Sequence, residues 1–447
     1  MTKLVKFWTK FLIRLAGRYG LVLIGSAVAG VIIFWAVHKS IPILSALIPQ
    51  TEIVGIAGKY NTSTLPPKIS HLISYGLTDI LPSGRATSSP IISRWITKDE
   101  GRQYLFFFKP NVHWQDGKLL TPDQINYQIE GAKFSSSENA TTISLDSTFS
   151  PLPTFLNKPI FKKNNIGFGS YRIEKARVSG GNFLSLSLTS MANRKKKMLF
   201  KFYPNEKTLK TAFKLNEVDE IWEISDITEF SSWKNLTIKS ENAMNKKYVA
   251  MFFNTRKNPF SSKRIRQALA YSIKKPAKKD RALGPISPAS WAYNGKVKNY
   301  NFNSQHAKKL LDKEESLQKE NFVIKIYALP EFLELAEKIK SDWQNYLGVK
   351  SEVHISSFVP SVDEFDVFVG YGVTPADPDQ YFFWHSTQQG NITGINSPKI
   401  DQWLEKGRKT IDFEERKKIY SDFQRALSEE VPAVFLLYPP SYHVSRQ

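Results

Sequence analysis

An apolar stretch near the N-terminus constrains the fold of this chain more than any other feature of its sequence. Residues 19–37 are all apolar or small (YGLVLIGSAVAGVIIFWAV), and a helix of about 20 such residues crosses the hydrocarbon core of a bilayer. The Leu, Ile, Val and Phe residues contribute on the order of −3 to −6 kcal/mol toward insertion. No second stretch of this kind follows. We therefore expect one transmembrane helix over residues 19–37 and a large body on one side of the membrane.

Charges on either side of this stretch predict its orientation. Residues 1–18 contain five basic residues and no acidic one, whereas only His38 and Lys39 are basic immediately after the stretch. Lysine and arginine concentrate on the cytoplasmic side of a membrane helix. The sequence therefore predicts a basic cytoplasmic segment at 1–18, a linker at 38–51 and an extracytoplasmic body.

A cleaved signal peptide would show the same charge pattern. Its apolar core is usually shorter, and a pair of small residues should precede the cleavage point. Ala46 is small, but Leu44 occupies the second position where a small residue is needed. We favour an uncleaved anchor in the cytoplasmic membrane.

Composition indicates the class of protein to which the body belongs and the kinds of chemistry and partner that are compatible with it. The 447 residues are 41% hydrophobic and 23% charged, which is typical of folded proteins with two or three domains. The absence of cysteine excludes disulfides, a thiol nucleophile, an iron–sulfur cluster and a cysteine-linked lipid. For the net charge of +21, nucleic acid and an anionic membrane surface or cell wall are candidate partners, but we favour the interpretation that the basic residues form a solvated, self-repelling surface. The basic runs at 194–197 and 274–279 lack interleaved aromatic residues, so nucleic acid is not expected.

Apolar strand-like runs alternate with helix signals along the body, which predicts an α/β fold. Strands are expected at residues 52–57, 104–109, 322–327, 349–355 and 365–369. Helices are expected to begin at Thr121, Ser262, Pro330, Ser397 and Asp412. The first of these has a complete capping box, with Pro122 at the first helical position and Gln124 as the reciprocal partner.

Catalytic motifs are missing from the sequence. It has no G-x-S-x-G, H-E-x-x-H or Walker motif, and its seven histidines are scattered. We therefore expect neither an enzyme nor a resident metal or cofactor. Asp377 and Asp379 could bind a cation, although Asp-Pro-Asp is also an ordinary turn sequence.

Several short motifs occur in an order that resembles one family. They are WQDGKLLTP at 114–122, GFGSY at 167–171, NPFSSKRIRQAL at 258–269, DPD at 377–379 and VPAVFL at 431–436. In this order they resemble the bacterial extracellular solute-binding proteins of family 5, the peptide-type receptors of ABC importers. The resemblance covers most of residues 52–444, with a shortened first lobe and C-terminus.

This resemblance implies a two-lobed α/β fold of the periplasmic-binding-protein type (type II). Lobe 1 would comprise residues 52–245 plus 425–447, and lobe 2 residues 246–424. A peptide or similar small polar solute would bind between the lobes and pass to an ABC importer permease. Candidate ligand-binding residues, whose alternative role is packing between the lobes, are Trp291, Tyr293, Tyr371, Thr374, Asp377 and Trp384.

One departure from the family affects the expected ligand. Thr374 occupies the position where peptide-binding relatives carry an aspartate that holds the α-amino group of the ligand, and a hydroxyl cannot supply that charge-assisted bond. Two alternatives to a transport receptor remain open. One is a degenerate surface sensor or scaffold, and the other is a basic surface protein that binds nucleic acid or an anionic cell-wall polymer.

Overall fold

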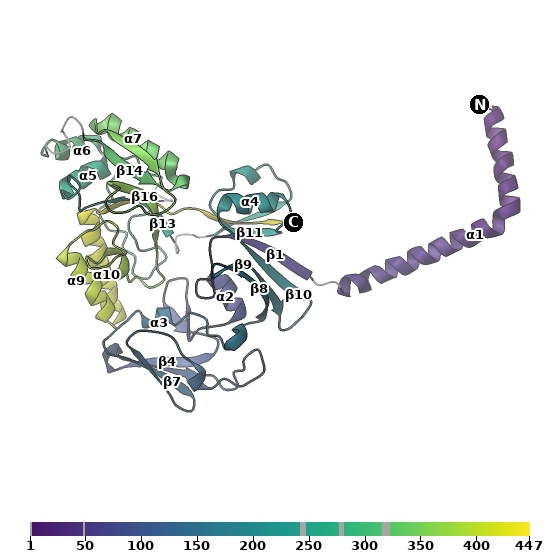
Figure 1. The fold of residues 1–447 in the computed structure, drawn as a ribbon, viewed down its shortest axis with the longest axis horizontal. Coiled ribbons are helices and arrows are strands. Elements are labelled where there is room, and N and C mark those ends of the chain that lie inside the picture. Colours follow the sequence, from purple (N-terminus) through teal and green to yellow (C-terminus); the bar gives the residue numbers. More distant parts are fainter. Residues whose placement is uncertain (1, 48–49, 242–246, 277–280, 315–321) are drawn as a thin grey trace.

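A computed structural model describes residues 2–47, 50–241, 247–276, 281–314 and 322–447. The first element, α1 (Thr2–Leu47), is a long helix that projects away from the body (Figure 1). Within it, Gly17–Lys39 is long and apolar enough to cross a membrane, and none of its apolar window is buried. The helix continues through most of the expected linker, whose residues 48 and 49 lie outside the described residues. The span itself stays a prediction.

The first lobe is built on a seven-stranded sheet in the order β12-β18-β11-β1-β10-β9-β8. Side chains alternate across β1, so that Val54 and Ile56 face one core and Ile53 and Ala57 face the other. Helix α2 (Pro67–Ile73) packs in the first core and α4 (Glu206–Lys214) in the second. The strands are β1 (Gln50–Ala57), β8 (Tyr171–Ser179), β9 (Asn182–Ser190), β10 (Lys196–Tyr203), β11 (Glu220–Ile224), β12 (Leu236–Glu241) and β18 (Ser441–Arg446).

A smaller part of the first lobe contains a four-stranded antiparallel sheet in the order β4-β5-β7-β6. Its core includes Tyr104, Phe106 and Trp114, whose ring stacks on Phe168 at 3.9 Å between centroids. The elements of this part are the paired strands β2 (Thr78–Ile80) and β3 (Ala86–Ser88), then β4 (Ile92–Lys98), β5 (Gln103–Phe108), β6 (Ala132–Ser136), β7 (Ala140–Leu145) and α3 (Leu152–Phe155).

The prediction of a helix that begins at Thr121 is wrong. The capping box forms, but only a 3₁₀ turn (Pro122–Gln124) follows it. Extended backbone begins at Ile125, which is buried in the core of the four-stranded sheet. Two residues later the Tyr127 hydroxyl accepts a hydrogen bond from the Leu77 amide and donates to the Leu156 or Lys158 carbonyl oxygen. These tertiary contacts outweigh the local helix signal.

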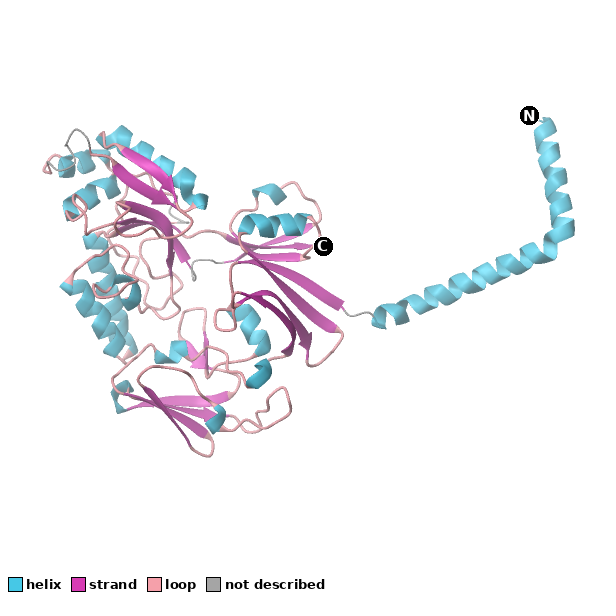
Figure 2. Ribbon diagram, in the orientation of Figure 1, coloured by secondary structure: helices cyan, strands magenta, loops and turns pink. Residues whose placement is uncertain are grey.

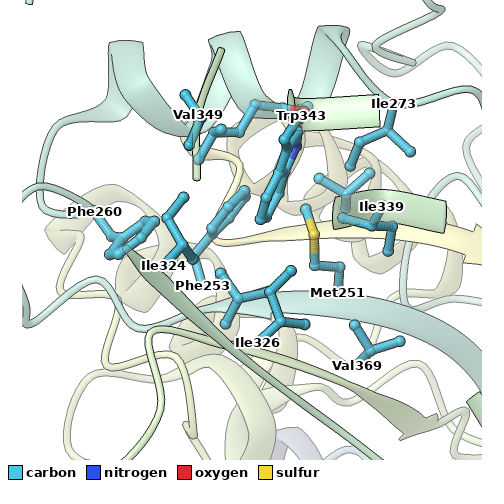
Figure 3. Close-up of a cluster of buried hydrophobic side chains, with 14 of the residues drawn as sticks. Met251, Phe253, Phe260, Ile273, Ile324, Ile326, Ile339, Trp343, Val349 and Val369 are labelled. Carbon is cyan, nitrogen blue, oxygen red and sulfur yellow. Dashed lines mark hydrogen bonds between the residues drawn. The ribbon is translucent and has the colours of Figure 1, made fainter. Parts of the chain in front are cut away.

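The second lobe contains a five-stranded sheet in the order β15-β14-β16-β13-β17. Helices α5 (Lys263–Tyr271), α6 (Ser304–Leu311) and α7 (Leu333–Leu347) cover one face, and α9 (Pro398–Lys409) and α10 (Phe413–Glu430) cover the other (Figures 1 and 2). Trp343 and Ile339 from α7 pack on Met251, Ile324 and Ile326 of the sheet (Figure 3). The remaining elements are β13 (Lys247–Phe253), β14 (Ile324–Ala328), β15 (Ser351–Ile355), β16 (Val367–Val373), α8 (Tyr381–Trp384) and β17 (Ala433–Leu437).

Helix limits in this lobe follow the expected capping chemistry. The Ser262 hydroxyl accepts from the Ile265 amide at 3.5 Å, and the Asp412 carboxylate accepts from the Glu415 amide at 2.8 Å. Gly348 ends α7 in the left-handed region, with φ of 70°, where glycine is strain-free. The predicted starts of α5, α9 and α10 are confirmed.

The predicted two-lobed α/β class is confirmed. The chain leaves the five-stranded sheet after β17 and enters the seven-stranded sheet at β18. Residues 425–447 therefore do not all lie in the first lobe as expected, because β17 pairs with β13 and its residues 433–436 are buried in the second-lobe cores. The other expected boundary, at residues 245 and 246, lies outside the described residues.

Candidate functional site

The turn between β2 and β3 brings the first lobe into contact with the second. The carbonyl oxygen of Ser83 accepts a hydrogen bond from the Trp291 amide at 3.0 Å. Gly84 has φ of +83°, and a Cβ added there would lie 2.2 Å from the Ala376 carbonyl oxygen. Only glycine fits this conformation and this close approach. Next to it, the Arg85 guanidinium lies 4.3 Å from the centroid of the Phe413 ring.

A cavity of about 110 Å³ lies at this contact. Residues 80–84 line it from the first lobe, and Ser287, Ser290 and residues 374–376 line it from the second. Thr374 is 95% buried (5% exposed), and its hydroxyl has no hydrogen-bond partner among the described residues. Because a buried hydroxyl without a partner costs free energy, a small polar group that bonded to it would be stabilised. The volume of the cavity exceeds the roughly 30 Å³ that one water molecule occupies in the liquid.

The expected residues Trp291 and Tyr293 lie beside this contact. The Trp291 ring is 4.6 Å from the Phe413 ring and 6.2 Å from that of Tyr420, so it packs against the start of α10. Tyr293 packs on the second-lobe core, and burial raises the pKa of its hydroxyl. Neither side chain is among those that line the cavity. Whether they touch a ligand stays a prediction.

Tyr371 lies on β16, near the first lobe but outside the cavity. Its ring packs edge-on against Phe332 at 4.7 Å, and the Lys247 ammonium lies 4.3 Å from its centroid. Burial raises the pKa of Tyr371, and the nearby carboxylates of Glu331 and Glu206 raise it further. Glu206 belongs to α4 of the first lobe, so Tyr371 faces the border between the lobes.

Asp377 forms a buried ion pair with Arg416. The two guanidinium–carboxylate distances are 2.8 and 2.6 Å, and each side chain is only 8% exposed. Burial opposes the charge on Arg416, but the Asp377 carboxylate and the Tyr420 hydroxyl raise the pKa of the guanidinium above its usual value. Asp377 also accepts from the Asp379 amide at 2.9 Å. Its oxygens are therefore occupied within the protein, which disfavours the predicted contact with a ligand.

These contacts also bear on the possible cation site. The Asp379 carboxylate pairs with Arg408 at 2.9 Å, just as Asp377 pairs with Arg416. Within the described ranges there is no group of three or more His, Asp or Glu side chains that could hold a metal ion. The Asp-Pro-Asp sequence forms an arginine-paired turn here.

Trp384 is a core residue of the second lobe. It is 2% exposed and packs on Phe252 and Phe435, with ring centroids 6.4 and 6.1 Å away. Its indole N–H has no partner in the described part of the chain, and the same holds for both amide atoms of the fully buried Gln380. The segment from Thr374 to Trp384 thus contains three buried side chains with unpaired polar atoms.

Sequence reasoning missed the first-lobe half of the cavity. Pro82, Ser83 and Gly84 form an ordinary turn sequence, and nothing local shows that this turn meets Ser287 and Ser290 more than 200 residues later in the chain. The glycine was the available signal, since a glycine in a tight turn often permits close backbone approach.

Comparison with known proteins shows a family resemblance over part of the chain. Residues 190–394 match the family model described as bacterial extracellular solute-binding proteins, family 5 middle. The dipeptide-binding protein of Escherichia coli (strain K12) is 24% identical over 249 residues, which are 50% of this chain and 46% of that protein. The predicted resemblance to family 5 is confirmed. Heme-binding protein A of Haemophilus influenzae is also similar, at 24% identity over 234 residues, or 47% of this chain and 42% of that protein.

Solved structures show the same fold over most of the chain. NikZ from Campylobacter jejuni, solved with Ni(L-His), has a TM-score of 0.74 at 21% identity and covers 89% of this chain and 94% of its own. The oligopeptide-binding protein AppA from Bacillus subtilis, solved with a nonapeptide, has a TM-score of 0.68 at 17% identity, with 89% and 95% covered. At these identities the likeness shows the fold, and the chain aligns with about half the length of its curated relatives.

Replacing Asp377 with asparagine should lower the free energy of unfolding by about 3–5 kcal/mol, because Arg416 would remain buried without its counter-charge. Urea unfolding of the full chain in detergent measures the change. Asp422→Asn is the matched control, since Asp422 pairs with the largely exposed Arg425 and should contribute only about 0–1 kcal/mol. Equal, small changes in both variants would contradict a structural role for the buried pair.

Proposed function

We propose that this chain is a membrane-anchored extracytoplasmic receptor that captures a small polar solute between its lobes and delivers it to an ABC importer. The observation that carries the proposal is the cavity between the lobes, which is lined by Thr374, a residue whose buried hydroxyl has no partner among the described residues. Closure of two lobes around a ligand is a recurring form of hinge motion, and ligand contacts with both lobes favour the closed state.

The lining of the cavity favours a particular kind of ligand group. The residues around it are serine, threonine, glycine, proline, alanine, leucine and isoleucine, none of which is charged. Asp377 and Asp379 are near in sequence, but both are paired with arginines. We infer that the part of the ligand that enters the cavity is an uncharged hydrogen-bonding group, such as the amide of a blocked peptide, rather than an ammonium group.

Helix α1 would hold the receptor at the membrane. It has the length and apolar composition of a span, and its N-terminal segment is basic. Because the chain contains no cysteine, a lipid attached through that residue is excluded as the anchor. An uncleaved helix would keep the receptor near a membrane-embedded permease.

We expect a stabilising ligand among free peptides, N-acetylated peptide amides and small polar solutes. Thermal unfolding of the full chain in detergent, with and without each compound, would identify it by a rise in melting temperature. A ligand at 100 times its Kd should stabilise the fold by about 2.7 kcal/mol. Thr374→Val should weaken that ligand by up to about 10-fold, since one hydrogen bond is lost, and should leave the unliganded protein folded. Thr51→Val, on the exposed start of β1, is the control and should not change affinity. If no compound of these classes raises the melting temperature, the receptor proposal fails.

The full-length chain should remain in the membrane fraction after alkaline extraction, with its N-terminal residues intact by mass spectrometry. Val28→Arg with Ile32→Arg, near the centre of the span, should oppose insertion by about 5–7 kcal/mol and release the protein. Phe7→Arg with Phe11→Arg is the control, because these residues precede the span and adding positive charge there agrees with the predicted orientation. A shortened chain in the soluble fraction of the unmodified protein would instead show a cleaved signal.

A further inference from the structure

The edge of the first-lobe sheet carries an exposed basic surface. We define the basic patch as six exposed residues on β8, on the turn between β9 and β10 and at the start of β10, namely Arg172, Lys175, Arg177, Arg194, Lys195 and Lys196. The acidic side chain between them, Glu174, accepts from Lys197 at 2.8 Å and from the Thr189 hydroxyl at 2.6 Å. Its charge is therefore engaged locally, and the patch as a whole is strongly positive.

Strand register keeps the patch together. Arg172 lies opposite Thr189 on β9, and Thr189 lies opposite Lys197 on β10. The start of β8 and the start of β10 are therefore at the same end of the sheet. Further along the strands, Lys175, Arg177 and Lys201 border an open groove of about 550 Å³. The positive surface extends from the turn along the sheet.

The same register places the turn beside the end of α1. Strands β1 and β10 are parallel, Gln50 lies opposite Lys196, and the Gln50 amide donates to the Lys195 carbonyl oxygen at 2.9 Å. Helix α1 ends at Leu47, and each residue extends a chain by at most about 3.6 Å. Adding the spacing of about 5 Å between strands puts the turn within roughly 16 Å of the end of the helix.

We propose that the basic patch docks on anionic lipid headgroups of the membrane that α1 spans, and so fixes the orientation of the receptor body. This inference rests on the proposed anchor. Positive charges close to a membrane are attracted to anionic lipids over about a Debye length, and a tether that already holds them near raises their effective concentration. Lipid is favoured over nucleic acid because Gln50, which follows the end of α1 closely in the chain, pairs with Lys196 of the patch.

The test uses the full chain in nanodiscs of phosphatidylcholine, with and without 30% phosphatidylglycerol. Since the chain has no cysteine, Ala192→Cys provides a single labelling point in the turn, and energy transfer to dye-labelled lipid headgroups reports its distance from the membrane. We expect high transfer only with phosphatidylglycerol, and loss of that transfer in 1 M salt. Arg194→Gln, Lys195→Gln and Lys196→Gln together should lower the docked-to-undocked ratio by about 100-fold.

The matched control removes the same charge elsewhere. Lys308, Lys309 and Lys313 are exposed in and just after α6 of the second lobe, and their replacement by glutamine should leave energy transfer unchanged. Equal transfer in both kinds of nanodisc, or equal loss in both triple variants, would overturn the proposal. A label in the turn whose signal changes with added duplex DNA but not with phosphatidylglycerol would also overturn the proposal. Failure of the chain to enter nanodiscs at all would instead count against the anchor. Co-elution of the chain with the discs distinguishes a failed anchor from an anchored chain whose patch does not dock.

Discussion

The buried pair of Arg416 and Asp377 fixes the region where the lobes meet. Removing two charges from water is expensive, and bidentate geometry at 2.6–2.8 Å provides the attraction that opposes this cost. The pair joins α10 to the segment that follows β16, although the two residues are 39 positions apart in sequence. The position of the Thr374 hydroxyl therefore depends on a contact made by its neighbour Asp377.

Residues in the N-terminal half of α10 make the other contacts at this border. Phe413 meets the Trp291 ring and the Arg85 guanidinium of the first lobe, and Tyr420 meets both Trp291 and Arg416. Tyr104 of the first lobe is also near enough for Asp377 and Arg416 to influence its pKa, which burial raises. A change in the relative position of the lobes would alter these contacts. The border is thus where ligand binding and closure would be coupled.

Sequence reasoning succeeded where a signal is local and failed where a partner is distant. The caps of α5 and α10 and the glycine at the end of α7 act within one helical turn, so their residues predict these boundaries directly. The signal at Thr121 was equally local, but the buried Ile125 and the hydrogen bonds of Tyr127 stop the helix after one turn. The family resemblance predicts that Asp377 faces a ligand, and nothing in the Asp-Pro-Asp sequence reveals Arg416 as its partner. The Ser83–Trp291 contact, which joins the two lobes, could not be predicted for the same reason.

The central claim is that the two lobes close on a solute at the cavity beside Thr374. A direct measurement is the distance between spin labels at Ser137→Cys, on the exposed β6–β7 turn of the first lobe, and Lys338→Cys, on the exposed side of α7. Pulsed electron–electron double resonance on the full chain should show a broad distribution of label distances without solute. Once a stabilising solute saturates the protein, the distribution should be narrower and its mean distance shorter. A distribution that the bound solute leaves unchanged would contradict closure on a ligand.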